Sequence, residues 1–300
     1  MGSIEKHTKQ LRRPPWLKMQ LPHGHSSAEV RRLLSDLRLH TVCQSARCPN
    51  LGECWGERTA TFLILGDVCT RGCTFCAVAK GSPHPIEPDE PNRVAEAAFR
   101  LGLKHVVITS VTRDDLSDGG APHYAQTIRA VRRRLPQASI EILIPDFDGK
   151  PESLQEVLDE RPDVLNHNLE TVPRLYQTVR PGAAYAHSIA IIKQAAESGV
   201  IAKSGLMLGL GETFEEALDV MADLRDAGCQ NLTLGQYLQP TSKHIPIFRF
   251  VTPEEFATLK QRGIALGFHH VESGPLVRSS YMAHRALLPQ PIASVKHAIS

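Results

Sequence analysis

The sequence lacks the features typical of a membrane protein, a secreted protein or a nucleic-acid-binding protein. No run of about 18 apolar residues is long enough to span a bilayer, and residues 1–16 lack the apolar stretch of a secretory signal. Lys plus Arg number 34 and Asp plus Glu number 32, so no overall field favours nucleic acid or an anionic membrane. We therefore expect a cytoplasmic protein that binds neither nucleic acid nor a membrane.

Internal repeats and low-complexity tracts are also absent, and 300 residues suffice for one large domain or two small ones. From residue 61 onward, short apolar runs alternate with longer segments of helical period, which indicates a parallel α/β sheet. The expected strands are residues 62–66, 105–111, 139–144, 164–169, 200–208 and 231–237, and the expected helices are residues 91–101, 122–135, 151–160, 186–198, 214–227 and 253–266. Six such units fit either an open doubly wound sheet or an incomplete barrel.

The segments on either side of these units have a different composition. Residues 1–60 are rich in Pro, Arg and Cys and show little periodicity apart from a helix expected at residues 28–39. Residues 268–280 are expected to form either a last strand or a loop. We therefore expect an N-terminal extension over residues 1–60, the α/β units over 61–267 and a C-terminal extension over 268–300.

Cysteine is sparse outside one region of the chain. Six of the seven cysteines lie between Cys43 and Cys76, whereas a disulfide scaffold is short and much denser in cysteine. Clustered cysteines in a reducing compartment are more often metal ligands. The seventh, Cys229, stands alone in an apolar context, and we interpret it as a buried structural thiol.

Three of the clustered cysteines directly follow the first expected strand. They form the pattern Cys69-Thr-Arg-Gly-Cys73-Thr-Phe-Cys76. Structural zinc usually takes four ligands, commonly as two separated pairs, so a compact group of three is unusual for it. Three soft thiolates in one loop suit a [4Fe–4S] cluster in which one iron is left open to a further ligand.

The other three cysteines precede that strand, at the spacing Cys43-x4-Cys48-x5-Cys54. The segment has neither helical nor strand periodicity, so we expect an irregular loop. A second cluster is the economical interpretation, because a single site of six cysteines would leave both spacings unexplained.

The later cysteine pattern, with Phe75 before its last cysteine, resembles the radical S-adenosylmethionine superfamily. The resemblance implies a partial (β/α)6 barrel of the TIM type. It also implies that the open iron chelates the amino and carboxylate groups of S-adenosylmethionine, and that the reduced cluster cleaves this cofactor to a 5′-deoxyadenosyl radical.

The two cysteine triads together resemble the lipoyl synthase family over about residues 14–285. The segments that carry the resemblance are ARCPNLGECW, GDVCTRGCTFCAV, TSVTRDDLSDGGA, NHNLET, VRPGA, KSGLMLGLGET and VRSSYMAH. It implies that the earlier triad and one serine of the last segment, Ser280 ahead of Ser279, hold an auxiliary [4Fe–4S] cluster. A serine oxygen is a weak iron ligand beside thiolates, which suits a cluster that loses iron during turnover.

Candidate contacts to S-adenosylmethionine follow the expected strands, because barrel-type α/β enzymes bind ligands where the strands end. Thr112 and Asp114 follow the second strand, and Asn168 and Glu170 follow the fourth. Gly209, after the fifth, would allow the backbone to approach the adenine ring closely. For each polar position, capping or turn chemistry is the alternative role.

The resemblance implies that sulfur is inserted at C6 and C8 of a protein-bound octanoyl chain, with sacrifice of the auxiliary cluster. These saturated carbons carry no acidic proton, so acid–base catalysis cannot activate them and a radical is needed. The implied partners are octanoylated lipoyl carriers, namely the E2 lipoyl domain of 2-oxoacid dehydrogenases and the glycine cleavage H protein, and an electron donor such as ferredoxin or flavodoxin.

Two other functions fit part of the pattern. Another radical S-adenosylmethionine sulfur-transfer enzyme, such as a biotin synthase or a methylthiotransferase, would place its second site differently. A two-cluster electron-transfer protein would not bind S-adenosylmethionine. Basic residues outnumber acidic ones in residues 1–40, which could steer an acidic carrier or simply form a solvated face.

Overall fold

The fold is organised around one eight-stranded sheet that does not close on itself. The computed structural model describes residues 12–18 and 25–287. In spatial order, the strands are β1(His40–Thr41), β2(Thr61–Ile64), β5(His105–Ser110), β6(Ser139–Leu143), β7(Val164–Asn166), β8(Ile201–Leu208), β9(Asn231–Gln236) and β10(His270–Gly274). All neighbours pair in parallel except β1 and β2. Within the described residues β1 and β10 form the two edges, so the sheet is an incomplete barrel.

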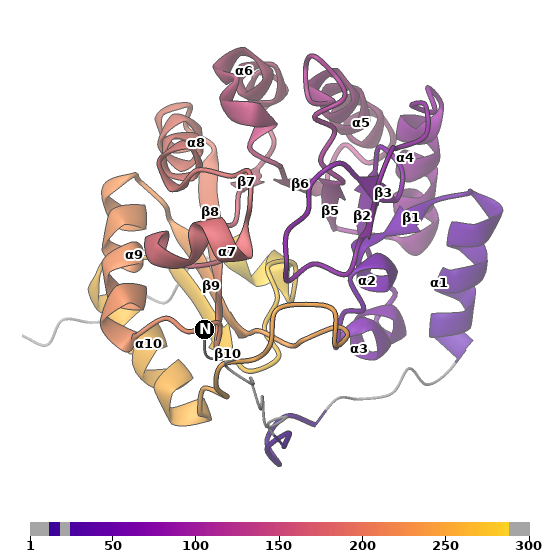
Figure 1. Cartoon of the computed structure of the whole chain (residues 1–300). Helices are drawn as coiled ribbons and strands as arrows, with labels where there is room; N and C mark the ends of the chain where they lie inside the picture. Colours follow the sequence, from indigo (N-terminus) through magenta and orange to yellow (C-terminus); the bar gives the residue numbers. More distant parts are fainter. Residues whose placement is uncertain (1–11, 19–24, 288–300) are drawn as a thin grey trace, which may run out of the picture.

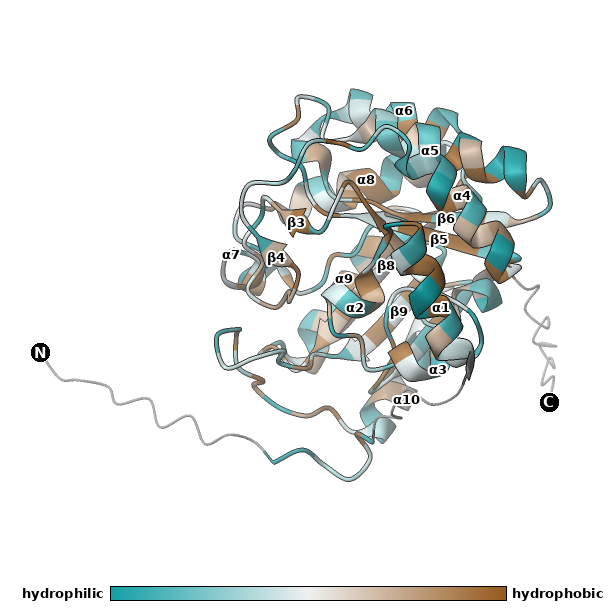
Figure 2. Cartoon of the chain, turned by 90° about the vertical axis from the view of Figure 1, so that its right-hand side faces the viewer, coloured by the Kyte–Doolittle hydropathy of each residue, from teal (hydrophilic) through white to brown (hydrophobic). Residues whose placement is uncertain are grey.

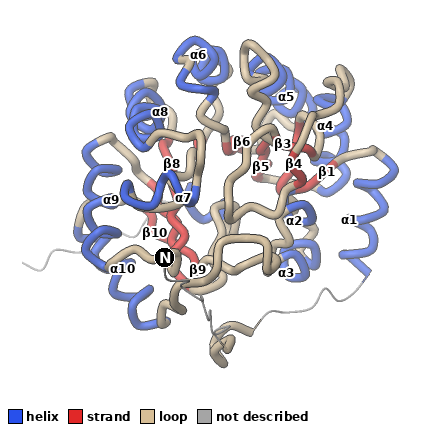
Figure 3. Tube along the Cα trace, viewed as in Figure 1, coloured by secondary structure: helices blue, strands red, loops and turns tan. Residues whose placement is uncertain are grey.

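Six helices form an arc around the outside of this sheet (Figure 1). They are α4(Glu90–Leu101), α5(Ala121–Arg134), α6(Pro151–Asp159), α8(Tyr185–Glu197), α9(Phe214–Asp226) and α10(Pro253–Ala265). Figure 3 shows the helices at the periphery and the strands inside. Ile64, Ile108 and Ile142 of neighbouring strands are fully buried, as expected where helices cover a parallel sheet. Apolar colour gathers on the strands, and polar colour on the outer helix faces (Figure 2).

Side-chain caps determine where two of the helices begin. Thr213 and Glu216 form a capping box at the start of α9, and Thr252 and Glu255 form one at the start of α10. In each box the threonine hydroxyl accepts a hydrogen bond from a backbone N–H group that has no partner within the first helical turn. Threonine followed three residues later by glutamate, before an apolar run, is the local sequence pattern that predicts such a box.

The six predicted strands and six predicted helices are all present, with ends that differ by a few residues. The flanking segments add further strands to the sheet. The segment expected to be a strand or a loop forms β10, a seventh parallel strand in register with β9 from His270↔Asn231 to Gly274↔Gly235. Both expected extensions therefore contribute a strand to the sheet, and the division of the chain at residues 60 and 268 stays a prediction.

The segment that holds the first cysteine triad differs from the prediction. Instead of an irregular loop, it contains α2(Val42–Ser45) and α3(Leu51–Gly56), with Cys43 in the first helix and Cys54 in the second. Helices of four and six residues are too short to show a helical period in the sequence. They are stabilised instead by tertiary packing, in which α1(His25–Asp36) contacts α3 and Trp55 is completely buried.

Shorter elements complete the described chain. They are β3(Val68–Cys69), β4(Ala79–Lys80), the 3₁₀ turns η1(Phe147–Gly149), η2(Pro173–Leu175) and η3(Ala283–Leu287), and α7(Tyr176–Val179). Strand β3, which contains Cys69 of the second triad, pairs with β4, which follows Cys76. Among the described residues, no helix has both the length and the apolar character needed to cross a bilayer.

Candidate functional site

One cavity of about 950 Å³ brings the two cysteine triads together. It lies where the strands end and extends into the barrel as far as His105 at the start of β5. The candidate residues that line it are Cys43, Cys48, Cys54, Cys69, Cys73, Cys76, Phe75, Thr112, Asn168, Glu170 and Ser280. Segments that are more than 200 residues apart in the chain thus share one wall of this cavity.

The thiols of the cavity fall into two groups of three. The charges of Cys43 and Cys48 raise the pKa of Cys54, and those of Cys73 and Cys69 raise the pKa of Cys76. Desolvation is the larger cause in both cases, and it brings each pKa to about 12. Buried thiols of this kind stay protonated at neutral pH unless a cation stabilises the thiolate.

The geometry of the triads fits iron–sulfur clusters better than single metal ions. Among the described residues, no three His, Cys, Asp or Glu side chains converge closely enough to hold one ion. A zinc site requires such convergence at bond lengths of about 2.0–2.3 Å. In a cubane cluster each thiolate binds a different iron, so three separated thiols are compatible with it. Each triad therefore offers three soft donor atoms to a cluster. The free-energy cost of burying the thiolates is offset when they bind metal.

The loop that carries the second triad is held in place by its neighbours. Cys69 Sγ accepts backbone N–H groups from Arg71 and Thr112, both at 3.4 Å. The N–H group of Thr74 donates to the carbonyl of Val179 at 3.0 Å. His244 Nε2 lies 3.0 Å from the carbonyl oxygen of Cys76, so this histidine fastens the loop through a hydrogen bond.

The segment Arg278-Ser279-Ser280-Tyr281 lies beside the first triad. Tyr281 Oη donates to Glu53 Oε1 of α3 at 3.0 Å, and Asn50 Nδ2 donates to the Leu276 carbonyl at 2.8 Å. Arg278 is partly buried and interacts electrostatically with Cys48. Ser279 and Ser280 both line the cavity, so the choice between them as a ligand stays a prediction.

Asn168 and Glu170 form a half-buried polar pair in the cavity wall. Asn168 Nδ2 donates to Glu170 Oε1 at 3.1 Å, whereas Asn168 Oδ1 is buried without a hydrogen-bond partner among the described residues. Gly205 leaves room for this oxygen, because a Cβ atom there would lie 2.9 Å from it. A buried acceptor without a partner is costly, so this position fits a ligand that donates a hydrogen bond.

Arg180 supports this pair, although it was not among the site residues expected from the sequence. Its guanidinium donates to the carbonyls of Asn168 at 2.9 Å and Leu169 at 3.3 Å, and to Tyr176 Oη at 3.1 Å. The residue lies in the segment VRPGA, which contributed only to the resemblance. Tyr176 precedes Arg180 by four residues, but the bonds of Arg180 to residues 168 and 169 depend on how the chain folds back after β7, which no local pattern indicates.

Two candidate residues, Asp114 and Gly209, do not line the cavity. Asp114 forms an ion pair with Arg71, with Oδ2 2.7 Å from Nε. Gly209 has a φ angle of 93°, and a Cβ atom at this position would collide with the carbonyl of Arg249. Tight backbone packing therefore accounts for this glycine, and the proposed cofactor contacts of both residues stay predictions.

Comparisons with known proteins agree with this arrangement. The family model of the radical SAM superfamily matches residues 63–224, and that of the N-terminal domain of lipoyl synthase matches residues 2–48. A lipoyl synthase of Rubrobacter xylanophilus is 55% identical, with 91% of this chain and 85% of that protein covered. One of Caldanaerobacter subterraneus is 54% identical, with coverage of 91% and 96%.

Solved structures resemble the fold at low sequence identity. Methylornithine synthase (PylB) gives a TM-score of 0.54 at 16% identity, covering 83% of this chain and 82% of that one. The FeFe-hydrogenase maturase HydG of Carboxydothermus hydrogenoformans gives 0.55 at 12% identity, covering 86% and 77%. These two support the fold alone. From the family models and the close relatives, the chain belongs to the lipoyl synthase family of the radical SAM superfamily.

Proposed function

We propose that this protein is a radical sulfurtransferase that inserts two sulfur atoms, at C6 and C8, into an octanoyl chain attached to a carrier protein. Membership of the superfamily implies a [4Fe–4S] cluster and S-adenosylmethionine. The observation that supports the proposal most directly is the single cavity lined by two separate cysteine triads and by the half-buried pair Asn168 and Glu170.

The residues of the cavity have distinct tasks in this proposal. When bound, the cluster at Cys69, Cys73 and Cys76 supplies the electron that cleaves S-adenosylmethionine, and the auxiliary cluster at the other triad supplies sulfur. Asn168 Oδ1 and the Glu170 carboxylate accept hydrogen bonds from the cofactor's amino group or ribose hydroxyls. Apolar lining residues such as Leu63, Val107 and Met207 exclude water around the saturated chain.

Ser280 is the proposed fourth protein ligand of the auxiliary cluster. Two hydrogen bonds support this role, because they hold the segment around Ser280 against α3, which carries Cys54. A hydroxyl oxygen binds iron more weakly than a thiolate does. A cluster with this ligand would release one iron more readily than a cluster with four cysteines.

The carrier is proposed to be an acidic protein domain, such as the E2 lipoyl domain or the H protein. Four exposed cationic residues, which we call the cationic rim, line the cavity: Arg13, Arg47, Arg58 and Lys104. Within the described part of the chain, none of them lies within 4.0 Å of a carboxylate oxygen, which is the distance limit for an ion pair. Unpaired cations that line a cavity favour an anionic partner.

The basic excess expected over residues 1–40 lies partly outside the described residues, since Lys6 and Lys9 are not among them. We also propose a ferredoxin or flavodoxin as the electron donor, and the cytoplasm as the compartment. A reducing cytoplasm would keep the cysteines available to iron, and all seven are free thiols in the structure.

A Cys48→Ala variant tests the division of labour between the two triads. Anaerobically reconstituted protein is incubated with an octanoylated carrier peptide, and iron content, 5′-deoxyadenosine and thiolated product are followed together. The variant should still form 5′-deoxyadenosine but no thiolated product. Loss of both activities while the cluster at Cys69 is fully loaded would contradict the proposal.

Cys229→Ala is the matched control for this variant. Cys229 is also a buried thiol, but it lies in the core and does not line the cavity. The control should keep both activities and lose only about 1–2 kcal/mol of unfolding free energy. An electron-transfer protein would cleave no S-adenosylmethionine in any variant, which separates that alternative.

A further inference from the structure

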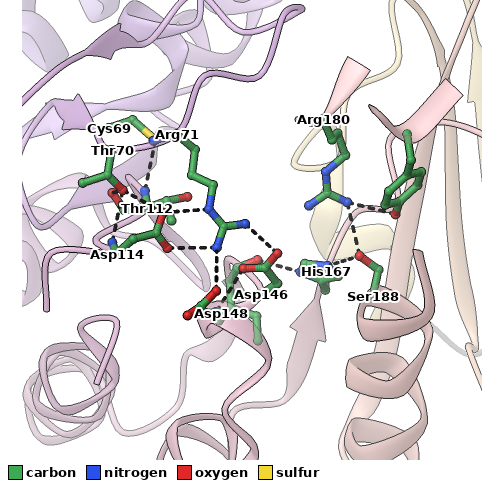
Figure 4. A network of polar contacts seen from close by, with 12 residues as sticks. Cys69, Thr70, Arg71, Thr112, Asp114, Asp146, Asp148, His167, Arg180 and Ser188 are labelled. Atoms are coloured by element: carbon green, nitrogen blue, oxygen red, sulfur yellow. Dashed lines mark hydrogen bonds and ion pairs between the residues drawn. The ribbon is translucent and has the colours of Figure 1, made fainter. Parts of the chain in front are cut away.

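Arg71 lies within the second cysteine triad, and both its backbone and its side chain are engaged. The guanidinium is mostly buried, with 11% of the side chain exposed. Nε and Nη2 donate to the two carboxylate oxygens of Asp114 at 2.7 and 2.9 Å, and Nη1 donates to Asp146 Oδ2 at 2.7 Å (Figure 4). The side chain is therefore occupied by two carboxylates from two different loops.

The same arrangement orients the two backbone N–H groups that point at Cys69. Asp114 follows Thr112 in the loop after β5, and Thr70 connects the two loops. Thr70 Oγ1 donates to the Thr112 carbonyl at 3.0 Å and accepts the Asp114 N–H at 3.1 Å. Because Arg71 and Thr112 are the residues whose N–H groups reach Cys69 Sγ, the ion pair sets the position of both donors.

The loop after β6 supplies the remaining contacts to Arg71. We call Arg71 with Asp114, Asp146 and Asp148 the clamp. Asp146 Oδ1 accepts the N–H of Asp148 at 3.1 Å, and Asp148 Oδ1 lies 3.8 Å from Arg71 Nη2. Phe147 and Asp148 both have positive φ angles, 47° and 55°, which side-chain-bearing residues rarely adopt. The turn is thus held in an uncommon conformation that aims two carboxylates at one guanidinium.

We propose that Arg71 is a positioning residue that holds Cys69 in the orientation needed to bind iron. It does so through the ion pairs with Asp114 and Asp146. Arg71 also lines the cavity, but its guanidinium is already bonded to these two carboxylates, so we assign it to positioning and not to substrate contact. Removing one partner of such a buried pair leaves the other charges uncompensated, so the loop would shift. The inference rests on the proposed function in one respect, that the second triad holds the S-adenosylmethionine-cleaving cluster.

The test compares Arg71→Met with Arg71→Lys in the reconstituted holoenzyme. Electron paramagnetic resonance of the reduced protein is recorded with and without S-adenosylmethionine, and the affinity for the cofactor is measured by titration. Arg71→Met should lower this affinity about 10- to 100-fold and change the cofactor-dependent signal, as is typical when a residue that orients a metal ligand is lost. Lysine should restore part of the affinity, since it keeps the charge but not the two-pronged geometry.

Arg174→Met is the matched control. Arg174 also donates two hydrogen bonds to one carboxylate, that of Glu216 at 2.7 and 2.9 Å, but it lies on the exposed surface and does not line the cavity. It should leave the spectrum and the affinity unchanged. The same loss in Arg174→Met as in Arg71→Met would overturn the proposal.

Three further outcomes decide the question. A wild-type signal and affinity in Arg71→Met would overturn the positioning role, as would an equal loss of iron from both clusters. If Arg71→Met does not fold, Asp146→Asn replaces it, because this variant removes one charge of the clamp at nearly constant shape. A wild-type protein that does not respond to S-adenosylmethionine would instead refute the proposed function itself.

Discussion

Glu170 combines burial of its carboxylate with an uncommon backbone conformation. Its φ angle is 68°, in the left-handed region, and burial raises the pKa of its carboxyl group, with Arg180 partly opposing this effect. Residues held in such conformations cluster at ligand sites, where the surrounding structure compensates for their strain. The ionised carboxylate is therefore costly in the empty cavity and becomes favourable when a cationic ligand enters.

A Glu170→Gln variant should separate binding from stability. Because the folded pKa is raised, the contribution of Glu170 to stability is present at low pH and is lost as the pH rises through the folded pKa. At neutral pH the cofactor-free variant should therefore be more stable than the wild type, by about 1 kcal/mol. Its affinity for S-adenosylmethionine should fall about tenfold or more. Thermal unfolding and calorimetric titration measure the two quantities.

The exposed Glu197 of α8 provides the control for that variant. Glu197→Gln should change neither the melting temperature nor the affinity measurably, because exposed pairs contribute little. Unchanged cofactor affinity in Glu170→Gln would contradict the assigned role of this carboxylate.

His167 makes the stability of the folded protein depend on pH. Its ring is completely buried between the Ile144 carbonyl and Ser188 Oγ, each at 3.0 Å, and desolvation together with the charge of Arg180 lowers its pKa from 6.5 to about 4. A lowered histidine pKa means that stability is present above pH 6.5 and is lost as the pH falls from 6.5 toward 4.

Replacing His167 with Gln should flatten this part of the pH profile. Urea unfolding at a series of pH values should show a loss smaller by up to about 3 kcal/mol than in the wild type. The exposed His187 serves as the comparison, and His187→Gln should leave the profile unchanged. A wild-type slope in the His167 variant would show that other groups cause the acid sensitivity.

At the scale of elements, the C-terminal segment and α3 act together around the first triad. Tyr281→Phe removes the hydrogen bond to Glu53 and should lower the unfolding free energy by about 1–3 kcal/mol. It should also speed the loss of iron from the auxiliary cluster to a chelator, while cleavage of S-adenosylmethionine stays unchanged. Iron release followed by absorbance measures the effect.

Tyr185→Phe is a matched control, since Tyr185 Oη donates to a carboxylate oxygen of Asp223 at 2.7 Å, away from the cavity. It should lose a similar amount of stability without faster iron release. Equal release rates in the two variants would argue against a role for residues 278–281 at the auxiliary cluster.

At the scale of the whole molecule, the net charge of +2 conceals a local excess of cations around the cavity. If the cationic rim binds an acidic carrier, the KM for an octanoylated carrier domain should rise with ionic strength. Arg58→Ala and Lys104→Ala should each raise it about two- to fivefold at low salt.

Two comparisons make this prediction specific. The KM for a short neutral octanoyl-lysine peptide should be unaffected by either variant, and Lys193→Ala on the outer helix α8 should leave the KM for the carrier unchanged. Equal effects on peptide and carrier would show that the rim residues act on the octanoyl-lysine substrate and not on carrier docking.

The sequence alone determined the six βα units, the two capping boxes and the separation of six cysteines into two triads. These features are local: helical and strand periods, Thr213 with Glu216, and the spacings between cysteines all lie within a few turns of chain. The lining of the cavity by Asn168 and Glu170 also followed from the rule that ligands bind where parallel strands end.

Only the tertiary structure decided the rest. Helices α2 and α3 are too short to show a helical period in the sequence. Residues 270–274 form a strand because they pair with the edge of β9. Arg71 meets Asp114 and Asp146, which lie 43 and 75 residues further along the chain, and no local pattern encodes such a meeting. Long-range contacts of this kind depend on how the sheet orders its strands, because that order determines which loops lie next to one another.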